Sequence, residues 1–274
     1  MDGIGMLGSK AGYVQGNDFQ LCQTCELAPA SARILVMESV SPTLSDSDRF
    51  RRIASPLHTV ILLAAEGVMA VRTTMHVEQM RNAIDLNRIH MYERTMLAEW
   101  LGFAFVLFGI WLAGSPVATV LGQRWRSFPD VLRDIGLGVA FSVVSTLMLS
   151  MLGPRQGGGT DRAIQFLLPH GSLEMTVWVA LSVSAGICEE AIYRGYLQRQ
   201  FVALTRSNPG GILLSGAMFG LVHSYQGFRW AVVIGLEGAM LGAMAHLRRS
   251  VRPGMIAHAG KDALAPVLMG LMKH

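Results

Sequence analysis

The feature that most limits the fold of this chain is a succession of seven apolar segments separated by polar connections. A perpendicular transmembrane helix needs about 20 mostly apolar residues, and several of these segments are shorter. We therefore expect one or two to be tilted, half-spanning or broken, and residues 210–224 to be the most irregular. Strand patterns are absent from the sequence, which predicts an all-α polytopic transmembrane bundle of about seven helices, within a range of six to eight. The segments cover residues 57–71, 95–114, 131–152, 174–200, 210–224, 230–247 and 254–272.

The composition agrees with a protein embedded in a lipid bilayer. Hydrophobic residues make up 51% of the chain and charged residues only 15%, too apolar a balance for a soluble domain of this size. Most of the positive charge comes from arginines in the short connections rather than from one basic patch, which argues against nucleic acid as a partner. The excess of arginine in alternate connections predicts that the N-terminus is cytoplasmic.

The first 54 residues differ from the rest of the chain. They mix Gly, Ser, Asp, Gln and Pro without a sustained period, which predicts a disordered polar leader before a membrane domain over residues 55–274. A basic start followed by a continuous apolar run is missing, so we expect no cleavable signal peptide, and Met37 is an alternative start. The pair Cys22 and Cys25 has no second ligand pair nearby and does not predict a metal site.

Three charges, Glu189, Glu190 and Arg194, stand at the end of the fourth apolar segment. An ionised side chain at bilayer depth costs roughly 2.5 to 3.5 kcal/mol on insertion scales, so such a cluster must be paired, hydrated or functional. On a helix, Glu190 and Arg194 share a face, whereas Glu189 points about 100° away. The arginine can therefore hold one carboxylate while the other stays free to act as a general base.

Two later apolar segments each carry a histidine in a helical pattern. His223 follows Phe219 by four residues, and His258 precedes Asp262 by four. A carboxylate one turn from a histidine can fix its tautomer and raise its basicity. Each histidine alone is explained by packing, and Glu190 with Arg194 by a structural ion pair. The three helices together predict a hydrated pocket that holds a metal ion or polarises water directly.

The motifs EEAIYR, FGLVH and HAGKD match, in order and spacing, E-E-x-x-x-R, F-x-x-x-H and H-x-x-x-(N/D). The chain thus resembles the CPBP intramembrane proteases, the family of CAAX proteases and bacteriocin-processing enzymes, over residues 174–272. The resemblance implies a helical bundle with a water-accessible intramembrane cavity in a bacterial inner membrane. It also implies a glutamate-dependent endopeptidase whose partner is a membrane-associated or lipid-modified peptide or protein.

The resemblance assigns a role to each of the six polar residues. Glu189 would activate the attacking water, with His223 as its partner in holding that water or a metal. Glu190 and Arg194 would order the site. The pair His258 and Asp262 would bind or stabilise the oxyanion. If zinc or another divalent metal is present, Glu189, His223 and His258 would be its ligands, but the motifs leave open whether the family needs a metal.

Other interpretations of the same residues remain open. The first is a noncatalytic membrane binding protein or a bacteriocin self-immunity protein of the same family. A proton-coupled transporter is less favoured, because the hydrophobic segments show no internal repeat. Glu66 and Glu237 are further acids in apolar segments, and each either lines the cavity, pairs with an arginine or reaches the membrane interface.

Overall fold

The computed structural model describes residues 50–83, 86–122, 124–152 and 165–271. The two N-terminal cysteines, Met37 and nearly all of the expected leader lie outside these residues. Throughout the described part the chain is helical between its turns, and one isolated bridge joins Gly122 to Ser250. The α-helices are α3 (Pro56–Arg81), α4 (Arg88–Leu112), α5 (Ala118–Leu121), α6 (Phe128–Leu152), α8 (Gly171–Glu189), α9 (Gln198–Thr205), α10 (Asn208–Val222), α11 (Phe228–Arg248) and α12 (Arg252–Leu271).

Within the residues that the structure describes, five helical stretches are long and apolar enough to cross a membrane, which confirms the predicted polytopic bundle. They are α3, α4, α6, α11 and the continuous stretch Gly171–Thr205, which joins α8 to α9. The bundle presents large apolar side chains on its outside: Val60 is 60% exposed, Trp111 71% and Leu147 58%. Such a surface suits lipid contact, since apolar patches of this extent are rare on soluble proteins.

Local signals fix where several helices begin. The side chains of Ser55, Asn87 and Ser207 accept hydrogen bonds from backbone N–H groups in the first turns of α3, α4 and α10. The expected irregularity at residues 210–224 is wrong, because α10 is a regular helix. It is short, with 15 residues, and packs along α11.

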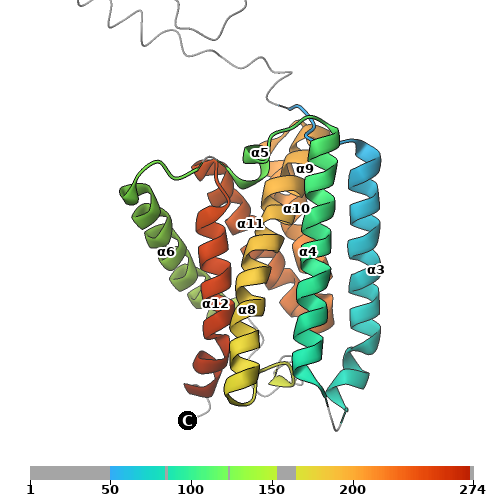
Figure 1. The fold of residues 1–274 in the computed structure, drawn as a ribbon, viewed down its shortest axis with the longest axis vertical. Coiled ribbons are helices and arrows are strands. Elements are labelled where there is room, and N and C mark those ends of the chain that lie inside the picture. Colours follow the sequence, from blue (N-terminus) through green and yellow to red (C-terminus); the bar gives the residue numbers. More distant parts are fainter. Residues whose placement is uncertain (1–49, 84–85, 123, 153–164, 272–274) are drawn as a thin grey trace, which may run out of the picture. The chain divides into compact units, whose positions relative to one another are not determined.

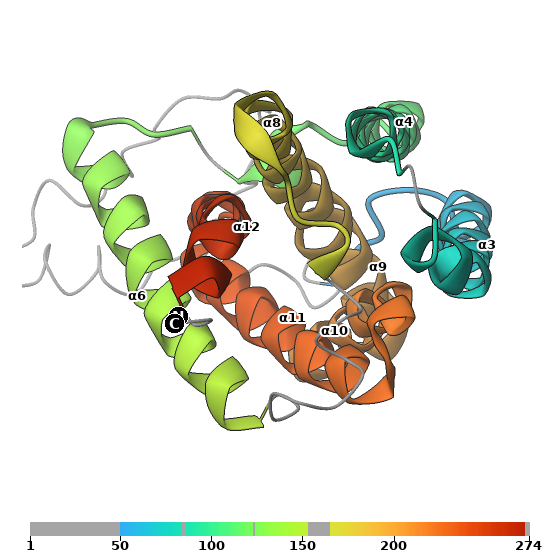
Figure 2. The ribbon, with the colours of Figure 1, turned by 90° about the horizontal axis from the view of Figure 1, so that it is seen from below.

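The stretch Gly171–Thr205 runs through the middle of the bundle (Figure 1). Helices α4 and α12 pack against α8, α3 lies beyond α4, and α6 packs on the outer side of α12. Seen along the helices, α10 and α11 close the side of the bundle away from α8 (Figure 2). This arrangement brings the end of α8 next to the middle of α12.

Close approach of α12 to α8 depends on two glycines. A Cβ at Gly186 in α8 would lie 2.8 Å from the Cβ of Ala259 in α12. A Cβ at Gly254 in α12 would lie 2.6 Å from Oε2 of Glu190. Real Cβ atoms do not come this near to other atoms, so any side chain at either position would push α12 away from the glutamates.

Between α8 and α9 the chain forms a π-helical segment, η2 (Glu190–Leu197), that the sequence did not predict. All eight of its residues are buried. Its neighbours hold it by polar contacts: Ser215 donates to the carbonyl oxygen of Tyr193 at 2.6 Å, and the hydroxyls of Tyr196 and Thr59 lie 2.9 Å apart. π-helical turns occur often at functional sites, and this one carries Glu190 and Arg194.

Candidate active site

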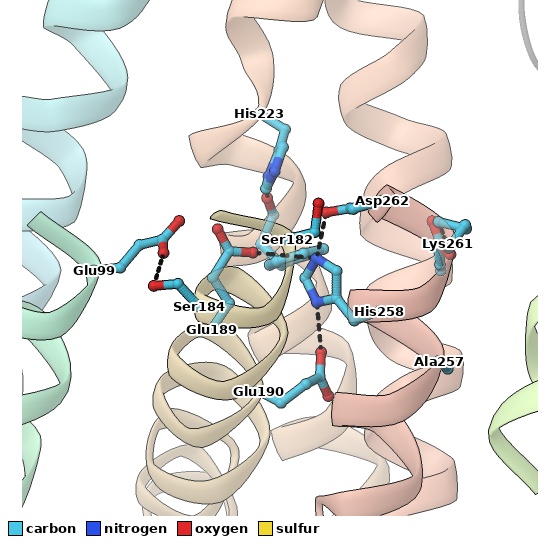
Figure 3. Close-up of polar contacts among 12 residues, drawn as sticks. Glu99, Ser182, Ser184, Glu189, Glu190, His223, Ala257, His258, Lys261 and Asp262 are labelled. Carbon is cyan, nitrogen blue, oxygen red and sulfur yellow. Dashed lines mark hydrogen bonds and ion pairs between the residues drawn. The ribbon is translucent and has the colours of Figure 1, made fainter. Parts of the chain in front are cut away.

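His258 is the centre of a polar cluster formed by the end of α8, by η2 and by α12 (Figure 3). Its Nδ1 lies 3.2 Å from Oε1 of Glu190. Its Nε2 lies 3.4 Å from Oδ2 of Asp262 and 3.6 Å from Oε2 of Glu189. One imidazole therefore faces three carboxylates, and each ring nitrogen has an acid as its neighbour.

Glu190 and Arg194 form a buried ion pair inside the bundle, as their spacing predicts. The Nη1 atom of Arg194 lies 2.9 Å from Oε1 of Glu190, and the two side chains are 1% and 0% exposed. Arg194 also donates from Nε to the carbonyl oxygen of Gly238 in α11 at 3.3 Å. Because Oε1 of Glu190 receives both the guanidinium and Nδ1 of His258, the pair fixes the position of the imidazole.

Glu189 and Asp262 differ from this pair in their access to solvent. Their side chains are 22% and 36% exposed, whereas that of His258 is 9% exposed. The adjacent glutamates thus have two environments, one enclosed and bound to arginine and one open. Glu189 is therefore the more exposed of the two glutamates, and Glu190 is the enclosed one.

The ring of Phe219 joins the other parts of the site. It lies 4.1 Å from the guanidinium carbon of Arg194 and edge to face with His258 at 5.8 Å between ring centroids. The centroid of the His223 ring is 4.7 Å away. Phe219 is buried on α10, so the F-x-x-x-H motif gives the site its aromatic wall as well as its second histidine.

His223 stands apart from the carboxylates. It caps the C-terminus of α10, and its Nδ1 lies 2.8 Å from the carbonyl oxygen of Phe219. Its side chain also neighbours the ring of Tyr225, with centroids 6.1 Å apart. Of the six residues singled out in the sequence, five are joined by direct polar contacts, and His223 is connected to them through Phe219.

A second buried ion pair lies next to His258, between Glu237 in α11 and Lys261 in α12. Ser145 in α6 donates to the same carboxylate oxygen at 2.6 Å. Glu237 thus has a lysine as its partner, where the sequence suggested an arginine. A small pocket opens beside this pair, which bears out the alternative that Glu237 lines a cavity. The pocket is lined by Phe141, Phe219, Glu237, Leu241, Ala257, His258 and Lys261.

Two further acids face the central helix from α3 and α4. Glu66 accepts a hydrogen bond from the hydroxyl of Tyr193 at 2.9 Å. Glu99 accepts one from the hydroxyl of Ser184 at 2.8 Å (Figure 3). Glu99 is not among the acids singled out from the sequence, although it lies within an apolar segment as Glu66 and Glu237 do.

Across the described residues, no three His, Cys, Asp or Glu side chains are grouped so that they could hold a metal ion. The expected ligand set of Glu189, His223 and His258 is not assembled, because His223 contacts Phe219 instead of the carboxylates. The side chains as they lie therefore do not fit a metal, and zinc binding stays a prediction.

Comparison with known protein families identifies part of the chain. Residues 171–264 match a family described as type II CAAX prenyl endopeptidase Rce1-like. The matched segment runs from the start of α8 to the middle of α12 and contains all six candidate residues. No curated protein and no solved structure matches the chain.

Proposed function

We propose that the protein is an intramembrane endopeptidase that hydrolyses a membrane-associated or lipid-modified peptide or protein, because residues 171–264 match the family described as type II CAAX prenyl endopeptidase Rce1-like. The five helical stretches of the described chain that are long and apolar enough to span a membrane support an integral membrane protein. The observation that carries the proposal is the contact of His258 with Glu189, Glu190 and Asp262, in which the side chains of Glu189 and Asp262 are partly exposed and that of Glu190 is buried.

In the proposed reaction Glu189 is the general base. It takes a proton from a water molecule, and the water oxygen bonds to the carbonyl carbon of the substrate. The oxyanion that forms is stabilised by His258, whose ring is oriented by Glu190 and Asp262. When the C–N bond breaks, Glu189 returns the proton to the leaving nitrogen. Glu189 thus acts as the base and Glu190 orients His258. The partial exposure of Glu189 and the burial of Glu190 support these separate roles.

Two other motif residues have supporting roles in this proposal. Arg194 pairs with Glu190 and fixes the position of the enclosed carboxylate, which holds Nδ1 of His258. His223 is proposed to hold the attacking water together with Glu189, since the ring of Phe219 packs on both histidines. The role of His223 requires its side chain to turn toward the carboxylates when substrate is bound.

The activity of purified protein against peptides tests this proposal. The family description suggests an S-prenylated peptide with a CAAX terminus as the first probe, followed by an unmodified peptide library. We expect Glu189→Gln to fold normally and to lose activity by about 100-fold or more, the usual contribution of general acid–base catalysis. The matched control is Glu78→Gln, which changes an exposed acid at the end of α3 and should keep full activity.

Equal activity of the wild type and Glu189→Gln would overturn the assignment of the base. A wild type that binds a bacteriocin or a prenylated peptide but cleaves neither would instead indicate a binding or self-immunity protein. Metal content and activity before and after chelation separate the two versions of the chemistry. Stoichiometric zinc that is lost in His258→Ala would support metal hydrolysis, and activity insensitive to chelators would support water activated by Glu189 alone.

A further inference from the structure

Positive charge gathers at one end of the bundle, the upper end in Figure 1. This end is formed by the starts of α3 and α6, by α5, by the end of α9 and by the turn between α11 and α12. Among the residues described there, the acids are Asp130 and Asp134, and both are paired with arginines. The exposed arginines at this end are Arg51, Arg52, Arg124, Arg126, Arg133, Arg199, Arg206 and Arg249.

The other end of the bundle carries a smaller excess of positive charge, from the exposed Arg72, Arg94 and Arg229. There Arg81 is paired with Glu78 at 2.8 Å, and Arg88 lies 4.0 Å from Glu174. Glu93 adds another exposed acid at the start of α4. The positive charge is therefore concentrated at the upper end of the bundle.

Contacts between residues 122–134 and 248–252 hold part of the cationic end together. The bridge between Gly122 and Ser250 fastens the segment before α6 to the turn before α12, and a Cβ at Gly122 would lie 2.6 Å from Cα of Ser250. Asp134, which is 2% exposed, accepts hydrogen bonds from Nη2 of Arg248 at 2.7 Å and from the indole of Trp125 at 2.8 Å. The guanidinium of Arg252 lies 5.1 Å from the centre of the Trp125 ring.

Two arginines beside these contacts have guanidinium groups without a hydrogen-bond or ion-pair partner among the described residues. Arg124 and Arg249 are exposed, and neither side chain has a partner within the part of the chain that the structure describes. Large apolar side chains stand beside them: Leu247 is 80% exposed, Phe128 71% and Trp125 44%. Cations mixed with exposed aromatic and aliphatic groups, at the end of membrane-spanning helices, are typical of the membrane interface.

We propose that the surface formed by residues 124–128 and 247–252 binds the phosphate of an anionic phospholipid headgroup. Arg124 and Arg249 would donate to the phosphate, and Trp125, Phe128 and Leu247 would lie against the glycerol and the upper acyl chain. The apolar side chains distinguish this surface from one that binds free phosphate or nucleic acid, neither of which has a hydrocarbon part to cover them. The cationic end would accordingly face the leaflet that is rich in anionic lipid.

The test uses full-length protein purified in neutral detergent. Its affinity is measured for short-chain phosphatidylglycerol, for phosphatidylcholine of the same chain length and for inorganic phosphate. We expect phosphatidylglycerol to bind more tightly than either of the others. Each arginine near an anionic surface contributes about fivefold in affinity, so Arg124→Gln and Arg249→Gln should each weaken phosphatidylglycerol binding by about that factor.

The matched control is Arg72→Gln with Arg94→Gln, which removes two exposed arginines outside the cationic end. Binding of phosphatidylglycerol by this variant should equal that of the wild type. Equal binding of the two phospholipids would overturn the proposal. Losses in Arg124→Gln and Arg249→Gln no larger than the loss in the control variant would overturn it as well. Binding of inorganic phosphate as tight as that of phosphatidylglycerol would show that the surface recognises the anion and not the lipid. None of these outcomes depends on peptide cleavage.

Discussion

The guanidinium of Arg194 lies 4.1 Å from the ring centre of Phe219, and the edge-to-face contact of the same ring with His258 spans 5.8 Å between centroids. A single aromatic side chain from α10 thus touches both the cation and the imidazole that converge on Glu190. Cation–π contacts in desolvated places contribute about 2 kcal/mol or more. The stability of the site and its geometry should therefore change together when Phe219 is replaced.

We expect Phe219→Ala to destabilise the protein by about 3 to 5 kcal/mol, because it leaves a cavity and removes the ring from Arg194. Phe219→Leu keeps most of the buried volume and should cost less in stability, while still lowering activity. Denaturant unfolding in detergent measures the first effect and peptide cleavage the second. Phe228→Ala is the matched control, since Phe228 is 83% exposed and its loss should change neither. A Phe219→Leu variant with full activity would contradict the positioning role of the ring.

Arg194→Met should destabilise the protein by about 3 to 5 kcal/mol, because it leaves the buried carboxylate of Glu190 without its cation. Adding Glu190→Gln to this variant removes the unpaired charge and should restore part of the lost stability. The measurement is the free energy of unfolding of the three variants. Arg81→Ala breaks a pair with an exposed acid and should cost less than about 1 kcal/mol. A double variant less stable than Arg194→Met would show that Glu190 is not the group left unpaired.

Asp262→Asn should retain cleavage within about tenfold of the wild type, whereas Asp262→Leu should lose about 100-fold or more. The amide of asparagine can accept from or donate to Nε2 of His258, whichever tautomer is present, but leucine can do neither. The two replacements have similar volume, so a difference in kcat/KM with equal stability isolates the polar contact. Equal losses in both variants would mean that a negative charge, rather than a hydrogen bond, is required.

Gly220→Ala tests the packing that carries the histidine on α10. A Cβ at Gly220 would lie 2.2 Å from the carbonyl oxygen of Ala231, so alanine must push α10 from α11. Overpacking of this kind costs about 1 to 3 kcal/mol, and it should also lower activity because Phe219 precedes this glycine. Gly136→Ala in α6 meets nothing within 4 Å and should leave stability the same or slightly higher. Thermal unfolding of the two variants decides the point.

The helices and the ion pair of Glu190 with Arg194 could be predicted from the sequence, because both depend on local spacing. Apolar segments of sufficient length predict spans, and an acid four residues before an arginine predicts a pair on one helical face. Sequence reasoning missed the contact of His258 with Glu190, since those residues lie on different helices and meet only because Gly186 and Gly254 let α12 approach. It also expected His223 to join the carboxylates, a distance that no local pattern determines.

The charged partner of Glu237 illustrates the same limit. Lys261 lies in a different helix from Glu237, and the pairing follows from the packing of α11 beside α12. An isolated acid in an apolar segment indicates that a partner is needed, because burying an ionised side chain without one costs much free energy. Which residue supplies that partner depends on the tertiary structure. The sequence therefore indicates that Glu237 needs a partner but does not indicate that the partner is Lys261.

The π-helical segment changes which side of the central helix each later residue faces. Its hydrogen bonds close over five residues instead of four, so the chain after Leu197 is out of phase with the chain before Glu189. A count of 3.6 residues per turn carried through the segment would assign Gln198 and Gln200 to the wrong neighbours. Deleting one residue from η2 would restore a regular helical phase between α8 and α9. The deletion would also rotate one half of the helix, so that either Glu189 turns away from α12 or α9 turns away from α3.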